Sequence, residues 1–404
     1  MLDDIRVLEL SAPPTMLAGQ ILGDLGADVI AIEPPAGSAG RRLAPFIHGQ
    51  PGLERSLTWH AMNRNKRGIT LDAETPDGRA ILAELIQRAD IVIEAVEGED
   101  SLCGLERPAH LIVCDVTAFS RSGPKAAYRA TDPVLVAAGG SPAMAGPPGR
   151  APIFFPVPQA IMEAGAEAAV ASLAALSARD RHGEGQRVDV QGRIATMPAT
   201  LGRLVSARSG GPHGRRMEPP RVGAMPAIPG IYECRDGHAV VTVAFSPAFV
   251  GLTQRIAEWL VEEGFLERDI AALDFMATAR AAMAGEGSAA PIERFVAALT
   301  TGCKTRTKAE IAEASKRYRF MAAPVMTMAD VAAFEHYRER GLFASQDVGG
   351  RAVEAPARFA QFSNYEIAIR RSAPSLSEHT LEVLTELAGL SPIEVQALFA
   401  QGVV

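Results

Sequence analysis

The sequence predicts an α/β protein of two domains, the larger of which is built on a parallel β-sheet. Short apolar runs alternate with helical patterns through the first third of the chain, as in parallel sheets covered by helices. A stretch rich in Gly and Pro at 208–221 then interrupts the pattern, as a linker does. The length of 404 residues also exceeds what one hydrophobic core usually holds.

The elements of the first third can be placed from these patterns. Strands are expected at 5–10, 28–32, 69–71, 91–93 and 111–116, and helices at 17–25 and 76–89. The region lacks the G-x-G-x-x-G and G-x-x-x-x-G-K-[ST] loops that hold nucleotide phosphates. The chain also has no G-x-S-x-G or H-E-x-x-H catalytic motif. The larger domain is therefore expected to be Rossmann-like without the dinucleotide-binding fingerprint.

A smaller α+β region follows the linker. Apolar runs at 230–234 and 239–243 flank Arg235-Asp236-Gly237-His238, which favours a hairpin, and helical patterns continue over 247–315. The tail, 374–401, fits two short helices. The expected parts are 1–204 as the first part of the large domain, 205–225 as a linker, 226–325 as the small domain, and 326–404 as a return linker and the end of the large domain.

One long helix is expected over 156–178. Its stretch 160–176 is the most apolar long run of the chain, but it contains Glu163 and Glu167 and is rich in Ala rather than Leu. These features predict a helix packed inside the protein and not a membrane span.

Composition narrows the classes of function. The net charge of −7 argues against a nucleic-acid-binding protein. The four cysteines lie far apart, without metal-ligand or redox spacing, so reduced thiols and no metal site are expected. The first residues lack the basic and apolar regions of a signal peptide. We therefore expect a cytoplasmic protein that binds neither nucleic acid nor a membrane.

Several blocks follow one another in a characteristic order along nearly the whole chain. They are 6–11, 22–35, Asn63-Arg64-Asn65-Lys66-Arg67-Gly68-Ile69-Thr70-Leu71-Asp72, Ser122-Gly123-Pro124, Asp132-Pro133, 183–190, Ala323-Pro324-Val325, Arg340-Gly341 and 376–380. Together they resemble the class III CoA-transferase family, also called CaiB/BaiF, which includes formyl-CoA transferase, benzylsuccinate CoA-transferase and alpha-methylacyl-CoA racemase. The block at 63–72 is the strongest single match.

The resemblance implies an architecture and a chemistry. The large domain is expected to include the C-terminal tail, and two chains are expected to interlock like rings. The active site is expected between the large domain of one chain and the small domain of its partner. The substrates would be an acyl-CoA, such as succinyl-CoA, and a carboxylic acid, with no permanently bound cofactor.

The chain departs from this family at the nucleophile. Family transferases carry a catalytic Asp four residues before a Gly, and matching that Gly to Gly165 places Ile161 at the Asp position. Because a helix turns about 100° per residue, Glu163 points about 200° away from residue 161 and is no direct replacement. Gln159 and Glu163 share a helix face, where they form either a polar pair at the site or a pair that stabilises the helix surface.

The expected CoA contacts are also altered. The resemblance leaves Arg41, Arg42, Arg64 and Lys66 as candidates for the phosphates, with Leu71 beside them, although a solvated basic loop is an equal alternative. Glu74 and Glu97 add negative charge where the resemblance implies CoA phosphates, and would repel them. Gly139 and Gly140 could donate backbone N–H groups to an oxyanion, or form an ordinary turn.

Three hypotheses follow from these departures. The first is a noncatalytic subunit of a heteromeric CoA-transferase, partnered by a paralogue that carries the Asp, as in the benzylsuccinate enzyme of this family. The second is a self-sufficient acyl-CoA lyase, hydratase or isomerase that uses another residue, such as Glu163. The third is a nonenzymatic acyl-CoA-binding protein. A homodimer and a heteromer both remain open.

Overall fold

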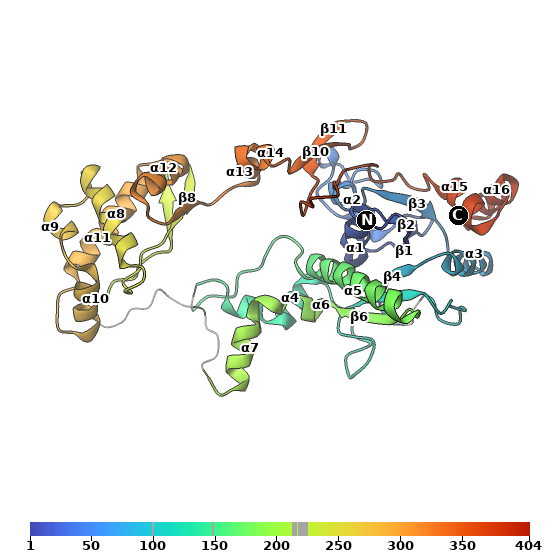
Figure 1. Ribbon diagram of the computed structural model, residues 1–404, viewed down its shortest axis with the longest axis horizontal. Coiled ribbons are helices and arrows are strands. Elements are labelled where there is room, and N and C mark those ends of the chain that lie inside the picture. The colour runs from blue at the N-terminus through green and yellow to red at the C-terminus, as the bar shows by residue number, and fades with distance from the viewer. Residues whose placement is uncertain (99–100, 148, 212–215, 217–224) are drawn as a thin grey trace. The chain divides into compact units, whose positions relative to one another are not determined.

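The computed structural model describes residues 1–404 except 99–100, 148, 212–215 and 217–224. The chain divides into two compact units (Figure 1). Unit 1 comprises Met1–Gly146, Pro152–Arg215 and His336–Val404, and unit 2 comprises Pro147–Ala151 and Arg216–Glu335. The chain therefore leaves unit 1, builds unit 2 and returns.

Unit 1 is built on a six-stranded parallel sheet with the strand order β3-β2-β1-β4-β5-β6. The strands are β1 (Arg6–Leu10), β2 (Asp28–Glu33), β3 (Lys66–Thr70), β4 (Ile91–Val96), β5 (Ile112–Thr117) and β6 (Arg187–Gln191). The first five confirm the predicted strands within a few residues. The edge strand β6 was not predicted, because its short run Arg-Val-Asp-Val-Gln is mostly polar and only half-buried.

Helices cover both faces of this sheet (Figure 1). One face packs against α1 (Pro13–Asp24) and α5 (Ala160–His182), and the other packs against α3 (Pro76–Gln87), α15 (Thr380–Ala388) and α16 (Pro392–Gln401). Neighbouring residues on a strand point to opposite faces, so Val7 joins the first core and Leu8 the second. The predicted α/β layers are confirmed.

Shorter elements complete unit 1. They are α2 (Leu57–Met62), α4 (Asp132–Gly139), α6 (Gly192–Ala195), α7 (Leu201–Arg208), the 3-10 turns Ala39–Arg42, Ile47–Gly49, Ser141–Met144 and Pro198–Thr200, and the antiparallel pair β10 (Phe343–Asp347) and β11 (Ala352–Pro356). The linker expected at 205–225 begins inside α7, and most of its other residues lie outside the described part of the chain.

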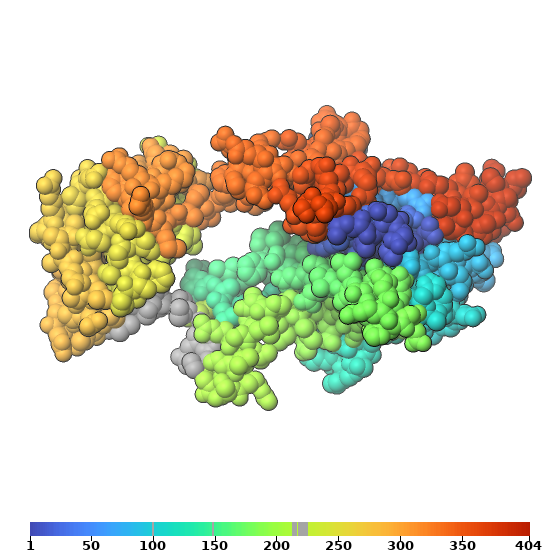
Figure 2. Space-filling view, viewed as in Figure 1, coloured from blue at the N-terminus to red at the C-terminus, as the bar shows by residue number. Residues whose placement is uncertain are grey.

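The C-terminal segment of unit 1 is fastened to the block at 63–72. Figure 2 shows the red C-terminal residues against the blue N-terminal ones. The Asn65 side chain accepts the backbone N–H groups of Arg370 and Arg371 at 2.7 and 3.1 Å. Gly68 and His379 exchange two hydrogen bonds, from the Gly68 N–H to His379 Nδ1 and from the His379 N–H to the Gly68 carbonyl. These bonds join segments about 300 residues apart in sequence.

Unit 2 packs helices against a three-stranded antiparallel sheet of order β7-β8-β9. The elements are β7 (Ile231–Cys234), β8 (Gly237–Val241), α8 (Val250–Glu262), α9 (Arg268–Ala271), α10 (Phe275–Ala284), α11 (Ala290–Lys304), α12 (Lys308–Tyr318), β9 (Ala322–Pro324) and α13 (Met328–Ala333), with α14 (Glu335–Glu339) starting at its end. The predicted hairpin is confirmed as β7 and β8. The small domain expected at 226–325 lies within these bounds.

The long helix α5 differs from its predicted limits. It begins at Ala160, four residues after the predicted start, because the segment with Pro156 and Pro158 is not helical. By length and composition α5 could cross a membrane. However, Ala164, Ala168 and Ala169 are buried against the core of unit 1, so the helix is packed as the sequence predicted.

Candidate functional site

The first turn of α5 carries Ile161, the residue that the sequence resemblance matches to the family's nucleophile. Ile161 is the second residue of this helix and is half-buried. The carboxylate of Asp132, from the first turn of α4, accepts the backbone N–H of Ile161 at 3.0 Å and that of Gln159 at 3.0 and 3.1 Å. Asp132 therefore caps the start of α5 from a neighbouring helix, although the sequence marked it only as part of a matching block.

The two polar candidates on α5 do not bond through their side chains. The Gln159 amide donates to the carbonyls of Val157 and Pro158, whereas Glu163 lies one turn further and is largely exposed. Partial burial, with smaller contributions from the charges of Asp132 and Glu167, raises the pKa of Glu163. Glu163 is thus a somewhat stronger base than an ordinary Glu.

An apolar pocket of about 140 Å³ adjoins this helix start. Its walls come from one face of α4, the turn after it and the extended segment before α5. The lining residues are Asp132, Pro133, Val136, Ala137, Pro142, Pro152, Ile153, Phe154, Phe155 and Gln159. The only ionisable group among them is the Asp132 carboxylate. The site can therefore hold an uncharged group beside the first turn of α5.

Gly139 and Gly140 end α4. This position is the one expected of an ordinary turn, the alternative to an oxyanion loop. The Gly140 N–H donates to the Ala137 carbonyl, and Gly140 has φ 91°, a left-handed conformation that favours Gly. A Cβ on Gly139 would lie 1.8 Å from Thr196 Oγ1. Both glycines thus fit the helix end and close packing, and an oxyanion role for their N–H groups stays a prediction.

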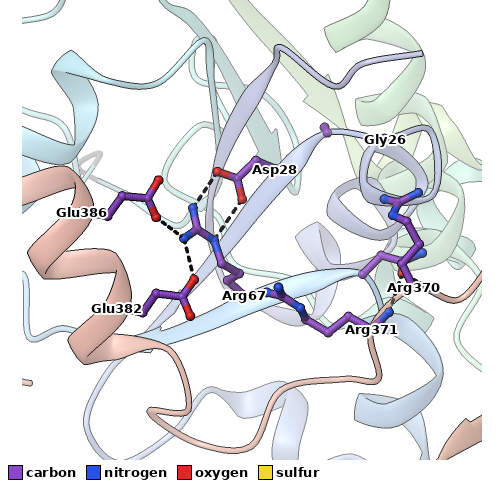
Figure 3. Close-up of a pocket in the computed structure, with 9 residues that line it drawn as sticks. Gly26, Asp28, Arg67, Arg370, Arg371, Glu382 and Glu386 are labelled. Carbon is purple, nitrogen blue, oxygen red and sulfur yellow. Dashed lines mark hydrogen bonds and ion pairs between the residues drawn. The ribbon is translucent and has the colours of Figure 1, made fainter.

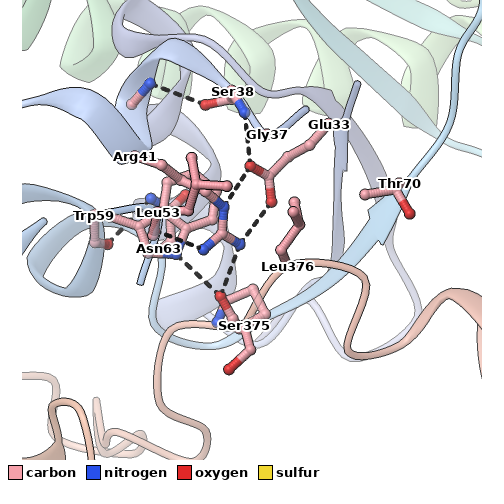
Figure 4. A network of polar contacts seen from close by, with 12 residues as sticks. Glu33, Gly37, Ser38, Arg41, Leu53, Trp59, Asn63, Thr70, Ser375 and Leu376 are labelled. Carbon is pink, nitrogen blue, oxygen red and sulfur yellow. Dashed lines mark hydrogen bonds and ion pairs between the residues drawn. The ribbon is translucent and has the colours of Figure 1, made fainter. Parts of the chain in front are cut away.

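Arg41 lies in a buried network of ion pairs and hydrogen bonds (Figure 4). Its guanidinium makes two hydrogen bonds to the Glu33 carboxylate, at 2.7 and 2.8 Å, and donates to the Pro374 carbonyl at 3.0 Å. The guanidinium also stacks 4.0 Å from the centre of the Trp59 ring. Arg41 is fully buried, so its charge is used to hold the returning C-terminal segment.

The other residues expected to contact CoA are also buried, with one exception. Lys66 is fully buried and donates to Glu9 at 2.6 Å, while Arg64 is buried against Asp24 at 2.7 Å. Burial lowers the pKa of Lys66. Leu71 is buried in the core between the sheet and α3. The carboxylates of Glu9 and Asp24 already neutralise Lys66 and Arg64, which the sequence alone could not show.

Arg42 is the exception, because its side chain is exposed. Its guanidinium donates to the carbonyls of Ala36, Gly37 and Ser38 at 2.8–3.0 Å. These bonds hold the turn after β2, but the exposed side of the guanidinium remains open to solvent. Contact between Arg42 and a phosphate thus stays a prediction.

Comparison with known proteins identifies the family. The profile of CoA-transferase family III matches residues 2–380. The chain belongs to CoA-transferase family III. It is 29% identical over 408 residues to succinyl-CoA:(R)-benzylsuccinate CoA-transferase subunit BbsE of Thauera aromatica. This alignment covers 99% of this chain and 97% of that relative. It is also 27% identical over 418 residues to the succinyl-CoA–L-malate CoA-transferase alpha subunit of Chloroflexus aurantiacus, covering 100% of this chain and 92% of the relative.

The fold matches solved members of CoA-transferase family III. A crystal structure of a CAIB/BAIF family protein from Brucella suis superposes with a TM-score of 0.76 at 26% identity. The match covers 95% of this chain and 98% of that protein. The similarity therefore extends over both units.

A second, charged pocket lies where β2 and β3 begin, with a volume of about 450 Å³ (Figure 3). Arg67 stands at its centre and contacts Asp28, Glu382 and Glu386 at 2.6–3.0 Å. Burial opposes ionisation of Asp28, but hydrogen bonds from Arg67 and Arg6 outweigh it and lower the Asp28 pKa. The acidic groups of the pocket are paired with Arg67, and the bonds of Arg67 to Glu382 and Glu386 bind α15 to the sheet.

No group of His, Cys, Asp or Glu in the described residues is arranged to hold a metal ion.

Proposed function

We propose that this chain takes part in CoA transfer between an acyl-CoA, such as succinyl-CoA, and a carboxylic acid, as the noncatalytic subunit of a heteromer. The observation that carries the proposal is Ile161 in the first turn of α5. An aliphatic side chain cannot attack a thioester, so the covalent step of transfer has no nucleophile at this position. The partner would be a paralogue with Asp at the matching position.

The neighbouring groups support this reading. Asp132 lies close to residue 161, but its oxygens accept three hydrogen bonds from the backbone of α5, which lowers their reactivity. Arg41, Arg64 and Lys66 are buried in ion pairs, so these three cations are already engaged within the chain. In addition, two relatives are named as subunits of enzymes that use succinyl-CoA.

The first test is covalent trapping on the purified chain. Incubation with succinyl-CoA and hydroxylamine should give no enzyme-bound hydroxamate, as measured by mass spectrometry. An Asp-bearing family III protein treated in the same way is the positive control. A hydroxamate on any residue of this chain would contradict the noncatalytic role.

The second test is association with the partner. The tagged chain should co-purify with an Asp-bearing paralogue when both are expressed together, and the pair should transfer CoA. The resemblance implies an interlocked dimer, so analytical ultracentrifugation should show a dimer in one or both preparations. A stable monomer under all these conditions would refute the proposed assembly.

One observation favours a second candidate function. Glu163 is exposed and its pKa is raised, so it could remove a proton from an acyl-CoA in a lyase, hydratase or isomerase reaction. In that case the isolated chain should exchange the α-protons of an acyl-CoA with deuterium, and Glu163→Gln should abolish the exchange. If the chain binds acyl-CoA without exchange and without a partner, a nonenzymatic binding role is the better description.

A further inference from the structure

The pocket beside the first turn of α5 is lined by apolar side chains from three separate segments. Pro133, Val136 and Ala137 lie at helical spacing on one face of α4, so they form a continuous wall. The facing wall comes from the extended run Ile153, Phe154 and Phe155, which the Ile153 N–H joins to the Ala145 carbonyl at 3.4 Å. This construction is independent of the ion pairs that fix the rest of unit 1.

The same run leaves large apolar side chains in contact with solvent. Ile153, Phe154 and Phe155 are 50%, 62% and 42% exposed. Single exposed apolar residues are ordinary, but a contiguous group around a pocket marks a binding site. A ligand that enters the pocket would cover part of this surface, and the apolar area removed from water would favour its binding.

The size of the pocket limits its occupant. An apolar cavity of about 150 Å³ is large enough to hold one benzene ring. The pocket has a volume of about 140 Å³, so it fits a single phenyl ring or a branched alkyl group of that size. A longer chain or a fused ring system would extend into solvent.

The charge at the pocket limits the occupant further. Asp132 is the only ionisable group in the lining, and its carboxylate accepts the backbone N–H groups of Gln159 and Ile161. No cation lines the pocket among the described residues. A second carboxylate, such as that of succinate, would therefore be repelled and left without a partner inside. The polar end of a ligand must remain at the mouth.

We infer that this pocket is a binding site of this chain for the apolar end of an organic acid, a group the size of one phenyl ring, and that it excludes short dicarboxylates. The inference goes beyond the proposed function, in which the transfer itself takes place at the catalytic partner, because it assigns a ligand to a pocket of this chain. The carboxylate of the acid would stay at the mouth, near Gln159 and the first turn of α5. Ala137 on α4 is the residue best placed to control the size of the occupant.

Binding of small acids to the full chain tests this inference. The probes are 3-phenylpropanoate and succinate, titrated with ligand-observed NMR in the absence of CoA and of any partner. Ala137→Phe fills the pocket from α4 and should weaken 3-phenylpropanoate binding by at least about 10-fold. Ala138→Phe is the matched control, because Ala138 is exposed on the same helix and lies outside the lining. Sedimentation of each variant is measured in the same buffer.

The outcomes separate this inference from the proposed function. Saturable binding of 3-phenylpropanoate, lost in Ala137→Phe and kept in Ala138→Phe, supports the pocket whether or not the chain forms a hydroxamate. Equal effects of the two variants, no binding by the wild-type chain, or tighter binding of succinate than of 3-phenylpropanoate would overturn it. A change of oligomeric state in Ala137→Phe alone would assign the pocket to a contact between chains and would also overturn it.

Discussion

Replacing Ile161 by Asp tests how the start of α5 shapes the chemistry at this position. The Ile161 N–H already donates to Asp132 at 3.0 Å, so a carboxylate on residue 161 would lie on the order of 5–6 Å from that of Asp132. Two unit charges at this separation repel by about 3 kcal/mol at an effective dielectric constant of about 20. The positive end of the helix dipole stabilises the introduced carboxylate by about 0.3–1 kcal/mol and so offsets part of this repulsion.

The net repulsion should raise the pKa of the introduced carboxylate by a measurable amount. About 2 kcal/mol corresponds to about 1.5 pKa units, so the introduced carboxylate should titrate well above the ordinary Asp value of about 3.9. Carbon-13 NMR of the Ile161→Asp chain can follow this group directly. The matched variant Ile161→Asp with Asp132→Asn retains an oxygen that accepts the N–H groups but removes the charge, and should return the pKa toward its ordinary value.

The same variant should not become an efficient transferase. A nucleophile acts only when the thioester is held within reach, and this chain uses Arg41, Arg64 and Lys66 in its own ion pairs. Hydroxylamine trapping should therefore detect at most a trace of adduct. Robust turnover by Ile161→Asp alone, or an introduced carboxylate that titrates at the ordinary value beside an intact Asp132, would refute this account of the site.

Three further changes test the roles assigned to buried polar groups. Asp132→Ala removes the acceptor for two N–H groups of α5 and should lower the free energy of unfolding by about 1–2 kcal/mol in urea denaturation, and Asp132→Asn by less. Lys66→Met leaves the buried Glu9 carboxylate without its ion-pair partner and should lower the free energy of unfolding by about 3–5 kcal/mol. Adding Glu9→Leu to the same chain should restore most of that free energy. Burial lowers the pKa of His379 below 6.5, so unfolding takes up a proton and stability should fall as pH drops through and below 6.5. His379→Gln should flatten that decline in thermal melting between pH 7.5 and 5, and an unchanged slope would exclude His379 as its cause.

The sheet could be predicted because its strands are short apolar runs bounded by helical patterns. Each run sits between two covered faces, so the runs of β1, β2, β4 and β5 contain several consecutive apolar residues, whereas β3 (Lys-Arg-Gly-Ile-Thr) was predicted only from its end. The strand β6 lacks this signal, since it lies at the edge and alternates polar with apolar residues. The start of α5 was placed too early because apolar periodicity alone cannot show that Asp132 caps the helix from α4.

The cations of the block at 63–72 could not be assigned from sequence for a similar reason. A basic residue in a loop-like motif reads equally as a phosphate ligand or as half of an ion pair. The deciding partners, Glu9 for Lys66 and Asp24 for Arg64, are about 40 to 57 positions away in the chain. Only the fold brings them within 3 Å, and it then removes the charges from solvent.

The position of these ion pairs fits the family fold whether or not residue 161 carries a carboxylate. The block at 63–72 binds the returning C-terminal segment through Asn65 and Gly68, and Arg41 binds the carbonyl of Pro374. None of these contacts includes Ile161 or the first turn of α5. The proposed loss of the reactive carboxylate would therefore leave the closure of unit 1 intact. Under that proposal the chain would lack the covalent step and still present a complete surface to a catalytic partner.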